Sequence, residues 1–323
     1  MKWISRLALI PALLLIDCAR GDGGWRIESP GRTFEVKGKI REGEDVSAAA
    51  MLNPTLAVVG SDETRELQFL RVDSATARCR IEGTLPLLDA EGAEIDIEGL
   101  AFSREKNRCY VTGSHALSRH KSQFEAERSS VFSLPASPQG LKRDGLQMAS
   151  LRDHLKADPV LGAYLDKTAA ENGLDIEGIA VKGGKLYFGL RAPNLDGKAF
   201  IVVVDADGFF AGNRGASERV PLPLGAGQGI RDIAAIDIGF LLIAGPSGSD
   251  DSGKAGAGYA VVFWPGAEAA PIQVGDIPSQ RGKPEALLVL AETAQFVDVL
   301  VFHDGGKDGA PVAYRISKPT ANR

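Results

Sequence analysis

Short runs of apolar residues, each bounded by glycine or polar residues, recur from about residue 45 to the end of the chain. The runs are too short for ordinary helices, and they are rich in the β-branched and aromatic residues that are typical of strands. Several are joined in pairs by tight turns, such as Lys182-Gly183-Gly184-Lys185, where glycine readily adopts the positive φ of a hairpin. The pattern predicts a protein built from β-hairpins.

The apolar runs belong to an internal repeat. Each copy begins with a short apolar strand, turns into a second strand, and continues to a third and, in most copies, a weaker fourth. The first strands begin D-I-E-G-L-A-F at Asp96, D-I-E-G-I-A-V at Asp175, G-I-R-D-I-A-A at Gly229 and K-P-E-A-L-L-V at Lys283, with a fainter copy, D-V-S-A-A-A-M, at Asp45.

Four antiparallel strands per repeat predict an all-β fold, a β-propeller of about five blades. The last copy ends at its third strand, so the unassigned strand at 33–40 is expected to supply the fourth and close the ring, which leaves no open sheet edge. Partial helical spacing over 152–172, interrupted by Pro159, predicts a short helical insertion. A β-sandwich is the alternative, but it explains the repeat less well.

The N-terminus differs from the rest of the chain. Lys2 and Arg6 precede an apolar stretch, Leu7 to Ile16, which is short for a membrane span and typical of a signal peptide. We therefore predict a signal peptide at 1–23 and a single propeller domain at 24–323, exported to the periplasm or secreted, without a transmembrane span in the mature chain. Cys18 follows the apolar stretch, as in a lipoprotein leader, but Asp17 departs from the small residue expected there. Lipidation of Cys18 and simple secretion both stay open.

Composition and charge narrow the class of protein. Hydrophobic residues make up 44% and charged residues 24% of the 323 residues, as in a globular domain with a sizeable core. The net charge of −5 argues against a nucleic-acid partner. Cys79 and Cys109 lie in strand-like segments, and an exported protein could hold them either paired or as separate buried thiols.

Alignment of the repeats also aligns polar residues. The first strand of each blade lines the central channel of a propeller, and the second strand runs back to the same mouth, so polar residues at these ends converge on one concave site. The candidate ligand-binding residues are Glu98, Glu177, Arg231, Glu285 and Asp304, and the candidate catalytic residues are His115, Arg191 and His303.

Two classes of function fit this convergence. In the first, the propeller binds a small molecule or an envelope protein at the polar mouth. In the second, a metal-assisted hydrolase holds a divalent cation such as calcium on Glu98, Glu177 and Glu285, and cleaves esters or phosphate esters. A third reading is structural, because carboxylates at strand starts could accept hydrogen bonds from the next blade. The sequence does not separate an enzyme from a binding protein.

The repeat motifs resemble an uncharacterised bacterial family, the domain of unknown function 3616. The matching segments are D-I-E-G-L-A at Asp96, T-G-S-H-A-L-S-R at Thr112, D-I-E-G-I-A at Asp175, F-G-L-R-A-P at Phe188, G-I-R-D-I at Gly229, I-A-G-P at Ile243 and P-E-A-L at Pro284. The resemblance implies a propeller-like fold and no particular activity. The E-G-I-A pattern is also similar to that of propeller hydrolases acting on phosphate esters and lactones.

Overall fold

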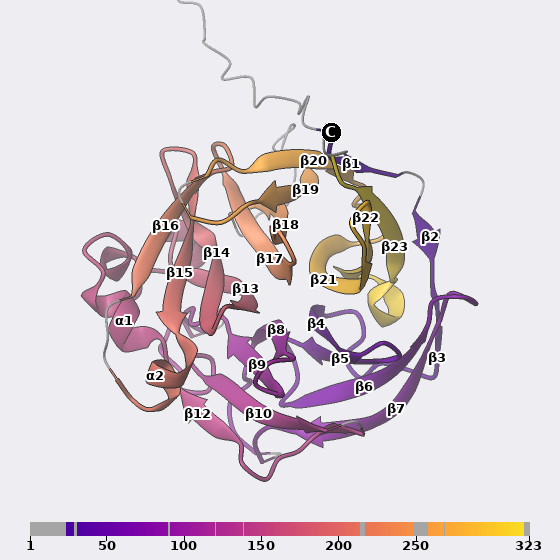
Figure 1. Cartoon of the computed structure of the whole chain (residues 1–323). Helices are drawn as coiled ribbons and strands as arrows, with labels where there is room; N and C mark the ends of the chain where they lie inside the picture. The colour runs from indigo at the N-terminus through magenta and orange to yellow at the C-terminus, as the bar shows by residue number, and fades with distance from the viewer. Residues whose placement is uncertain are drawn as a thin grey trace, which may run out of the picture.

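The computed structural model is a five-bladed β-propeller in which five mainly antiparallel sheets are arranged in a ring (Figure 1). The all-β fold, the number of blades and the short helical insertion predicted from the repeat are confirmed. The structure describes residues 24–28, 31–89, 91–119, 121–137, 139–213, 217–248, 258–267 and 269–319.

Each blade begins with its innermost strand and proceeds outwards. The first blade contains β4 (Val46–Asn53), β5 (Leu56–Ser61), β6 (Glu66–Asp73) and β7 (Arg78–Pro86). The second contains β8 (Ile97–Ser103), β9 (Arg108–Gly113) and β10 (Val131–Ser137), with the short β11 (Gly140–Leu141) and β12 (Gln147–Ala149) outside them. The third contains β13 (Asp175–Lys182), β14 (Lys185–Leu195), β15 (Lys198–Asp205) and β16 (Glu218–Pro223). The fourth contains β17 (Gln228–Ile236), β18 (Gly239–Pro246), β19 (Tyr259–Trp264) and β20 (Ile272–Ile277). The fifth contains β21 (Lys283–Glu292), β22 (Phe296–Asp304) and β23 (Val312–Ser317).

The N-terminal segment closes the ring, but not in the way that the sequence suggested. Two short strands, β1 (Arg26–Ile27) and β2 (Arg32–Thr33), pair antiparallel with β23 and complete the fifth blade. The next strand, β3 (Glu35–Lys37), leaves that blade and pairs in parallel with β7 of the first. The predicted closing strand at 33–40 is therefore wrong in its bounds, because the chain crosses from one blade to the next within it.

Helices are short and peripheral. The insertion between the second and third blades contains α1 (Arg152–Ala157) and the 3-10 turns η1 (Leu161–Ala163) and η2 (Ala169–Glu171). Its apolar side chains, Leu155, Leu161 and Leu165, are buried against these blades. Two further turns lie elsewhere, α2 (Ala206–Phe210) after β15 and η3 (Lys307–Gly309) after β22.

The core is divided among the blades. Five clusters of buried apolar side chains each join two neighbouring blades. Cys79 belongs to the cluster between the fifth and first blades and Cys109 to that between the first and second. Both are free thiols, and burial raises the pKa of each to about 12. Of the two alternatives for these cysteines, the structure shows separate packed thiols.

The glycine of the E-G motif allows the innermost strands to approach one another. A Cβ at Gly178 would lie 2.8 Å from the backbone nitrogen of Ile233 in the next blade, and one at Gly99 would lie 2.7 Å from that of Ile179. A side chain at either position would push two blades apart near the channel.

We expect Gly178→Ala to lower the free energy of unfolding by about 1–3 kcal/mol, because the added methyl group meets backbone that cannot rotate away. Urea unfolding followed by circular dichroism measures the change. The matched control is Gly83→Ala in β7, where a Cβ meets nothing within 4 Å. An equal effect of both substitutions would show that the approach of the blades is not the cause.

The predicted signal peptide at 1–23 and the candidate lipidation site Cys18 lie outside the described residues. Within the described part of the chain, the structure contains no helix that is long and apolar enough to cross a membrane.

Candidate functional site

The aligned polar residues share a backbone feature. In every blade the pairing of the first two strands shifts by one residue at the same position, as in a β-bulge. A bulge adds a residue to one strand and redirects its side chain. The five residues at these shifts are Ser47, Glu98, Glu177, Arg231 and Glu285.

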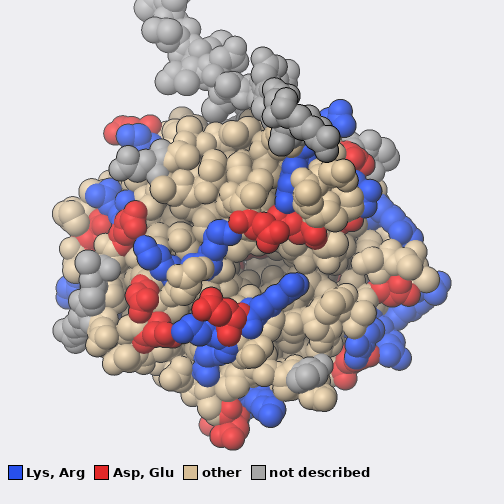
Figure 2. Space-filling view, viewed as in Figure 1, with Lys and Arg blue, Asp and Glu red and all other residues tan. Residues whose placement is uncertain are grey.

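These residues meet the ends of the second strands at a pocket of about 170 Å³. The pocket is lined by four of the five bulge residues and by Asp62, Arg191 and Asp304 from strand ends, together with Asp96, Asp175, Arg119, Arg128 and Lys283. Around the hollow centre of the molecule, Figure 2 shows acidic and basic side chains gathered together. The predicted residues Glu98, Glu177, Arg191, Arg231, Glu285 and Asp304 are therefore brought together.

His115 and His303 do not line this pocket. His303 in β22 directly precedes the pocket residue Asp304, and successive side chains of a strand point to opposite sides. His115 lies beyond the end of β9 in the left-handed region, with a φ of 58°, so strand alternation does not set its direction. His115 contacts the Gly113 carbonyl through Nδ1 at 3.0 Å and accepts a hydrogen bond from Leu151 N at Nε2. The Nδ1 atom of His303 lies 3.1 Å from the Ala310 carbonyl. Burial lowers the pKa of each histidine to about 4.

Both histidines are therefore neutral at neutral pH and engaged with backbone. The structure therefore places neither predicted histidine in the lining of the pocket. The reason is the register of the second strand for His303 and the left-handed backbone after β9 for His115.

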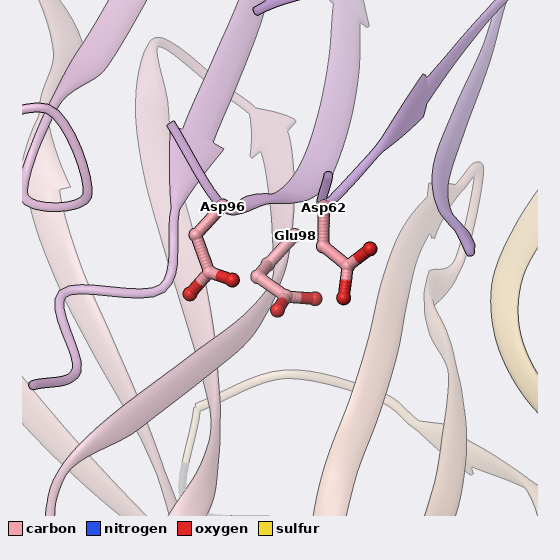
Figure 3. A group of neighbouring side chains, drawn as sticks. All are labelled: Asp62, Asp96 and Glu98. Carbon is pink, nitrogen blue, oxygen red and sulfur yellow. The ribbon is translucent and has the colours of Figure 1, made fainter. Parts of the chain in front are cut away.

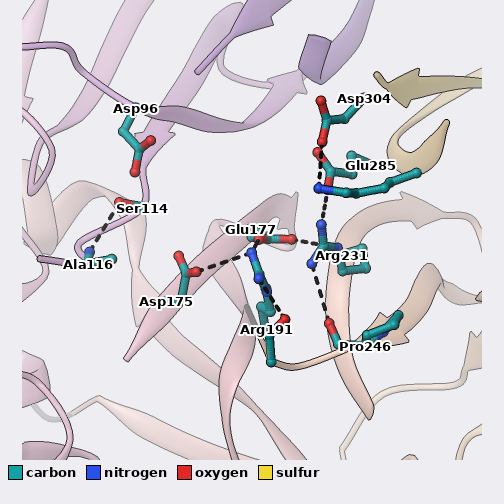
Figure 4. Close-up of polar contacts among 12 residues, drawn as sticks. Asp96, Ser114, Ala116, Asp175, Glu177, Arg191, Arg231, Pro246, Glu285 and Asp304 are labelled. Atoms are coloured by element: carbon teal, nitrogen blue, oxygen red, sulfur yellow. Dashed lines mark hydrogen bonds and ion pairs between the residues drawn. The ribbon is translucent and has the colours of Figure 1, made fainter. Parts of the chain in front are cut away.

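Two arginines hold the carboxylates of the third and fifth blades (Figure 4). Arg231, which is 1% exposed, places Nε 2.8 Å from Glu177 and bonds Glu285 through its Nη2 atom. Arg191 donates to Glu177 at 2.5 Å and to the Gly248 carbonyl at 2.9 Å. Burial alone would lower the pKa of Arg191, but the charges of Glu177 and Asp175 raise it. Glu177 and Glu285 are thus neutralised by arginine.

Some polar residues near the channel join blades, as the structural reading expected. The Ser47 hydroxyl donates to the Ile97 carbonyl, and the Leu287 amide donates to Asp232 at 2.6 Å. Ser47 comes from the faint first copy, and Asp232 stands where two other copies have the glycine of E-G. These two residues share the structural role with Glu177 and Glu285, which Arg231 joins across three blades.

A different set of acidic residues lies on the other side of the pocket. Asp62, Asp96 and Glu98 each present a carboxylate oxygen within 4.8 Å of the others (Figure 3). Asp96 forms an ion pair with Arg128. Among the described residues, Glu98 has neither a hydrogen bond nor an ion pair, although it is only 5% exposed. The Oδ1 atom of Asp62 is likewise buried without a partner.

The close packing of these carboxylates raises the pKa of Asp62 and of Glu98. Burial and the neighbouring Asp96 raise the pKa of Asp62 to about 8. Burial, followed by the charges of Asp96 and Glu177, raises the pKa of Glu98 well above its usual range. Three carboxylates at this spacing could hold a metal ion, since a cation would relieve both the repulsion and the burial cost.

The sequence matches the family described as "Protein of unknown function (DUF3616)" over residues 45–135 and 137–311. The chain belongs to this family. A search of curated proteins gives no match. DUF3616 membership therefore agrees with the resemblance drawn from the repeat motifs and adds no activity.

Solved structures with a similar chain path are distant in sequence. The PQQ-bound aldose sugar dehydrogenase of Streptomyces coelicolor is 12% identical, with a TM-score of 0.47 over 91% of this chain and 98% of the other. The exo-β-1,3-galactanase of Phanerochaete chrysosporium is 11% identical, with a TM-score of 0.47 over 92% of this chain and 64% of the other. These similarities are too weak to transfer any activity to this DUF3616 chain.

Several pocket residues were not singled out from the sequence. Asp96 and Asp175 open the D-I-E-G motifs, two positions before the glutamate. Asp62 ends the second strand of the faint first copy. The sequence signal for Asp96 and Asp175 was the repeated D-I-E-G motif, and that for Asp62 was the end of the second strand. Arg119 lies in a loop outside the repeat, and the sequence signal for it was its place as the last residue of the motif T-G-S-H-A-L-S-R.

Proposed function

We propose that this protein is a ligand-binding propeller whose site is the pocket at the channel mouth, with a divalent cation of the calcium type bound by Asp62, Asp96 and Glu98. The observation that carries the proposal is the buried carboxylate of Glu98, which faces two other acidic side chains without a compensating partner among the described residues. A buried carboxylate is normally paired, hydrogen-bonded or bound to a metal.

The distribution of charge supports this assignment over the one made from sequence. Glu177 and Glu285, which the sequence grouped with Glu98, already share Arg231. Asp304 is paired with Lys283 at 3.1 Å. The unbalanced negative charge is thus confined to the side of the pocket formed by the first and second blades, where Asp62, Asp96 and Glu98 lie.

The ligand atoms favour a hard cation. All three side chains offer carboxylate oxygens, which suit calcium or magnesium better than zinc. Calcium takes about six to eight oxygen ligands with flexible geometry, so three carboxylates leave positions for water or a ligand. The alternative is that Glu98 and Asp62 remain protonated and bind no ion, and the two states give opposite results in the following test.

Calcium is expected to raise the unfolding temperature of the protein near neutral pH, because an ion that binds only the folded state stabilises it by about 2.7 kcal/mol at about 100 times Kd. Glu98→Gln should abolish this shift and, in chelator, should not lower the unfolding temperature, because burial already disfavours the charged form of Glu98. Differential scanning calorimetry with calcium, magnesium or chelator measures both effects.

Glu285→Gln is the matched control, because Glu285 lines the same pocket but is held by Arg231. It should retain the calcium shift even if it lowers the baseline stability. The proposal is contradicted if neither ion shifts the wild-type protein, or if the shift is unchanged in Glu98→Gln.

A hydrolase is the second candidate, and Asp175 is the observation that favours it. Asp175 lines the same pocket, and burial together with the charge of Glu177 raises its pKa to about 7. A carboxylate with such a pKa can accept a proton from water at neutral pH. Calcium-dependent cleavage of nitrophenyl esters or phosphates that is lost in Asp175→Asn would favour this function, and absence of turnover in wild type would exclude those substrates.

Export remains part of the proposal. The apolar stretch at 7–16 between a basic N-terminus and Cys18 supports it. Mass spectrometry of the mature N-terminus from a bacterial host distinguishes a lipidated Cys18 from a cleaved, unlipidated chain and from an uncleaved one.

A further inference from the structure

Arg119 is a cation of the pocket that forms no bond with the residues that the structure describes. Its side chain lines the pocket and is exposed, so it lies at the opening and not in the core. It forms no hydrogen bond or ion pair with any described residue, in contrast to Arg128, Arg191 and Arg231, which are all held by carboxylates.

Arg119 faces the acidic trio. Burial opposes its charge, but the surrounding carboxylates of Glu98, Asp96, Asp175 and Asp62 raise its pKa. The guanidinium therefore interacts electrostatically with the carboxylates of the proposed ion site, but it forms no hydrogen bond or ion pair with them. A planar guanidinium that is free at a pocket opening is suited to bind an oxyanion through two parallel hydrogen bonds.

We infer that the ligand of this pocket presents an oxyanion, a carboxylate or a phosphate, which completes the coordination of the cation and is held from the opposite side by Arg119. The inference rests on the proposed function, since it needs the cation. Three carboxylates leave a calcium ion with open positions, and oxygen atoms of either anion can occupy them.

The size of the pocket limits how much of the ligand it holds. About 170 Å³ is less than the roughly 300–1,000 Å³ of sites that enclose a drug-sized molecule. The pocket therefore holds the charged group, and the remainder of the ligand extends past Arg119 towards solvent.

The test uses methyl phosphate and acetate as probes, titrated into the full chain by isothermal calorimetry with saturating calcium or with chelator. At least one probe should bind at least tenfold more tightly in calcium than in chelator. Arg119→Gln should weaken that binding about tenfold, the loss expected for one charge-assisted contact. It should not weaken the binding of calcium alone, because it removes a positive charge near the carboxylates. The comparison of the two probes distinguishes a phosphate ligand from a carboxylate ligand.

Arg80→Gln is the control, because Arg80 is an exposed arginine in β7, remote from the pocket lining. Calcium binding without binding of either probe would overturn this inference and leave the proposed function intact. Absence of calcium binding would overturn both. Probe binding that is equal in chelator, or equal in Arg119→Gln, would place the anion elsewhere and also overturn the inference.

Discussion

Replacing Arg231 by methionine is expected to lower the free energy of unfolding by about 3–5 kcal/mol, because it leaves two buried carboxylates without their counter-ion. Arg231 is 1% exposed and contacts both Glu177 and Glu285, while its Nη1 atom donates to the Pro246 carbonyl at 3.3 Å. It therefore joins three blades through one side chain. Urea unfolding near neutral pH measures the loss.

Two comparisons make the cause identifiable. Arg80→Met removes an exposed ion pair with Glu82 and should change stability by less than about 1 kcal/mol. Adding Glu177→Gln and Glu285→Gln to Arg231→Met should recover part of the loss, because the uncompensated charges are then gone. If the triple variant is no more stable than Arg231→Met, loss of packing and not charge would explain the effect.

Trp25→Ala is expected to destabilise the protein by a similar amount, about 3–5 kcal/mol. Trp25 is buried next to β1 and stacks on Phe263 of the fourth blade, with ring centroids 4.2 Å apart. The strand that follows it pairs with β23 of the fifth blade. The indole therefore anchors the closing strand across a blade boundary, and its loss should loosen the ring.

Hydrogen exchange identifies where the Trp25→Ala effect acts. The Glu28 amide, which donates to the Arg315 carbonyl at 2.8 Å, should exchange faster in the variant. Amides in the third blade should exchange faster only to the extent that the global free energy of unfolding falls. Phe124→Ala is the control, since Phe124 is 49% exposed and its loss should cost little. A change below about 1 kcal/mol for Trp25→Ala would mean that ring closure does not depend on this contact.

The internal repeat was sufficient to predict the architecture. Alternating apolar residues and glycine turns specify hairpins, and recurrence of one motif specifies blades, because each sheet can bury its faces only against similar neighbours. The repeat also predicted that Glu98, Glu177, Arg231 and Glu285 lie around one site, since residues at equivalent places in a closed ring must face a common axis.

Three features depended on contacts that no local pattern encodes. The closing strands were misplaced because β1 and β2 are each two residues long, too short to give a periodic signal. His303 was assigned to the pocket because a one-residue difference in register reverses the direction of a side chain, and His115 because the left-handed backbone after β9 leaves no periodic signal. The glutamates were treated as equivalent because the repeat makes them so in sequence.

Their differing electrostatic surroundings arise in three dimensions. Glu177 and Glu285 lie on either side of Arg231, whereas Glu98 faces Asp62 and Asp96. The pKa of a carboxylate depends on which charges lie within a few ångströms and on how far water is excluded. The nearby charges and the exclusion of water are both properties of the closed ring. The sequence alone therefore determined which residues reach the channel mouth. The packing of five blades against one another determined which of these residues remain free to bind a ligand.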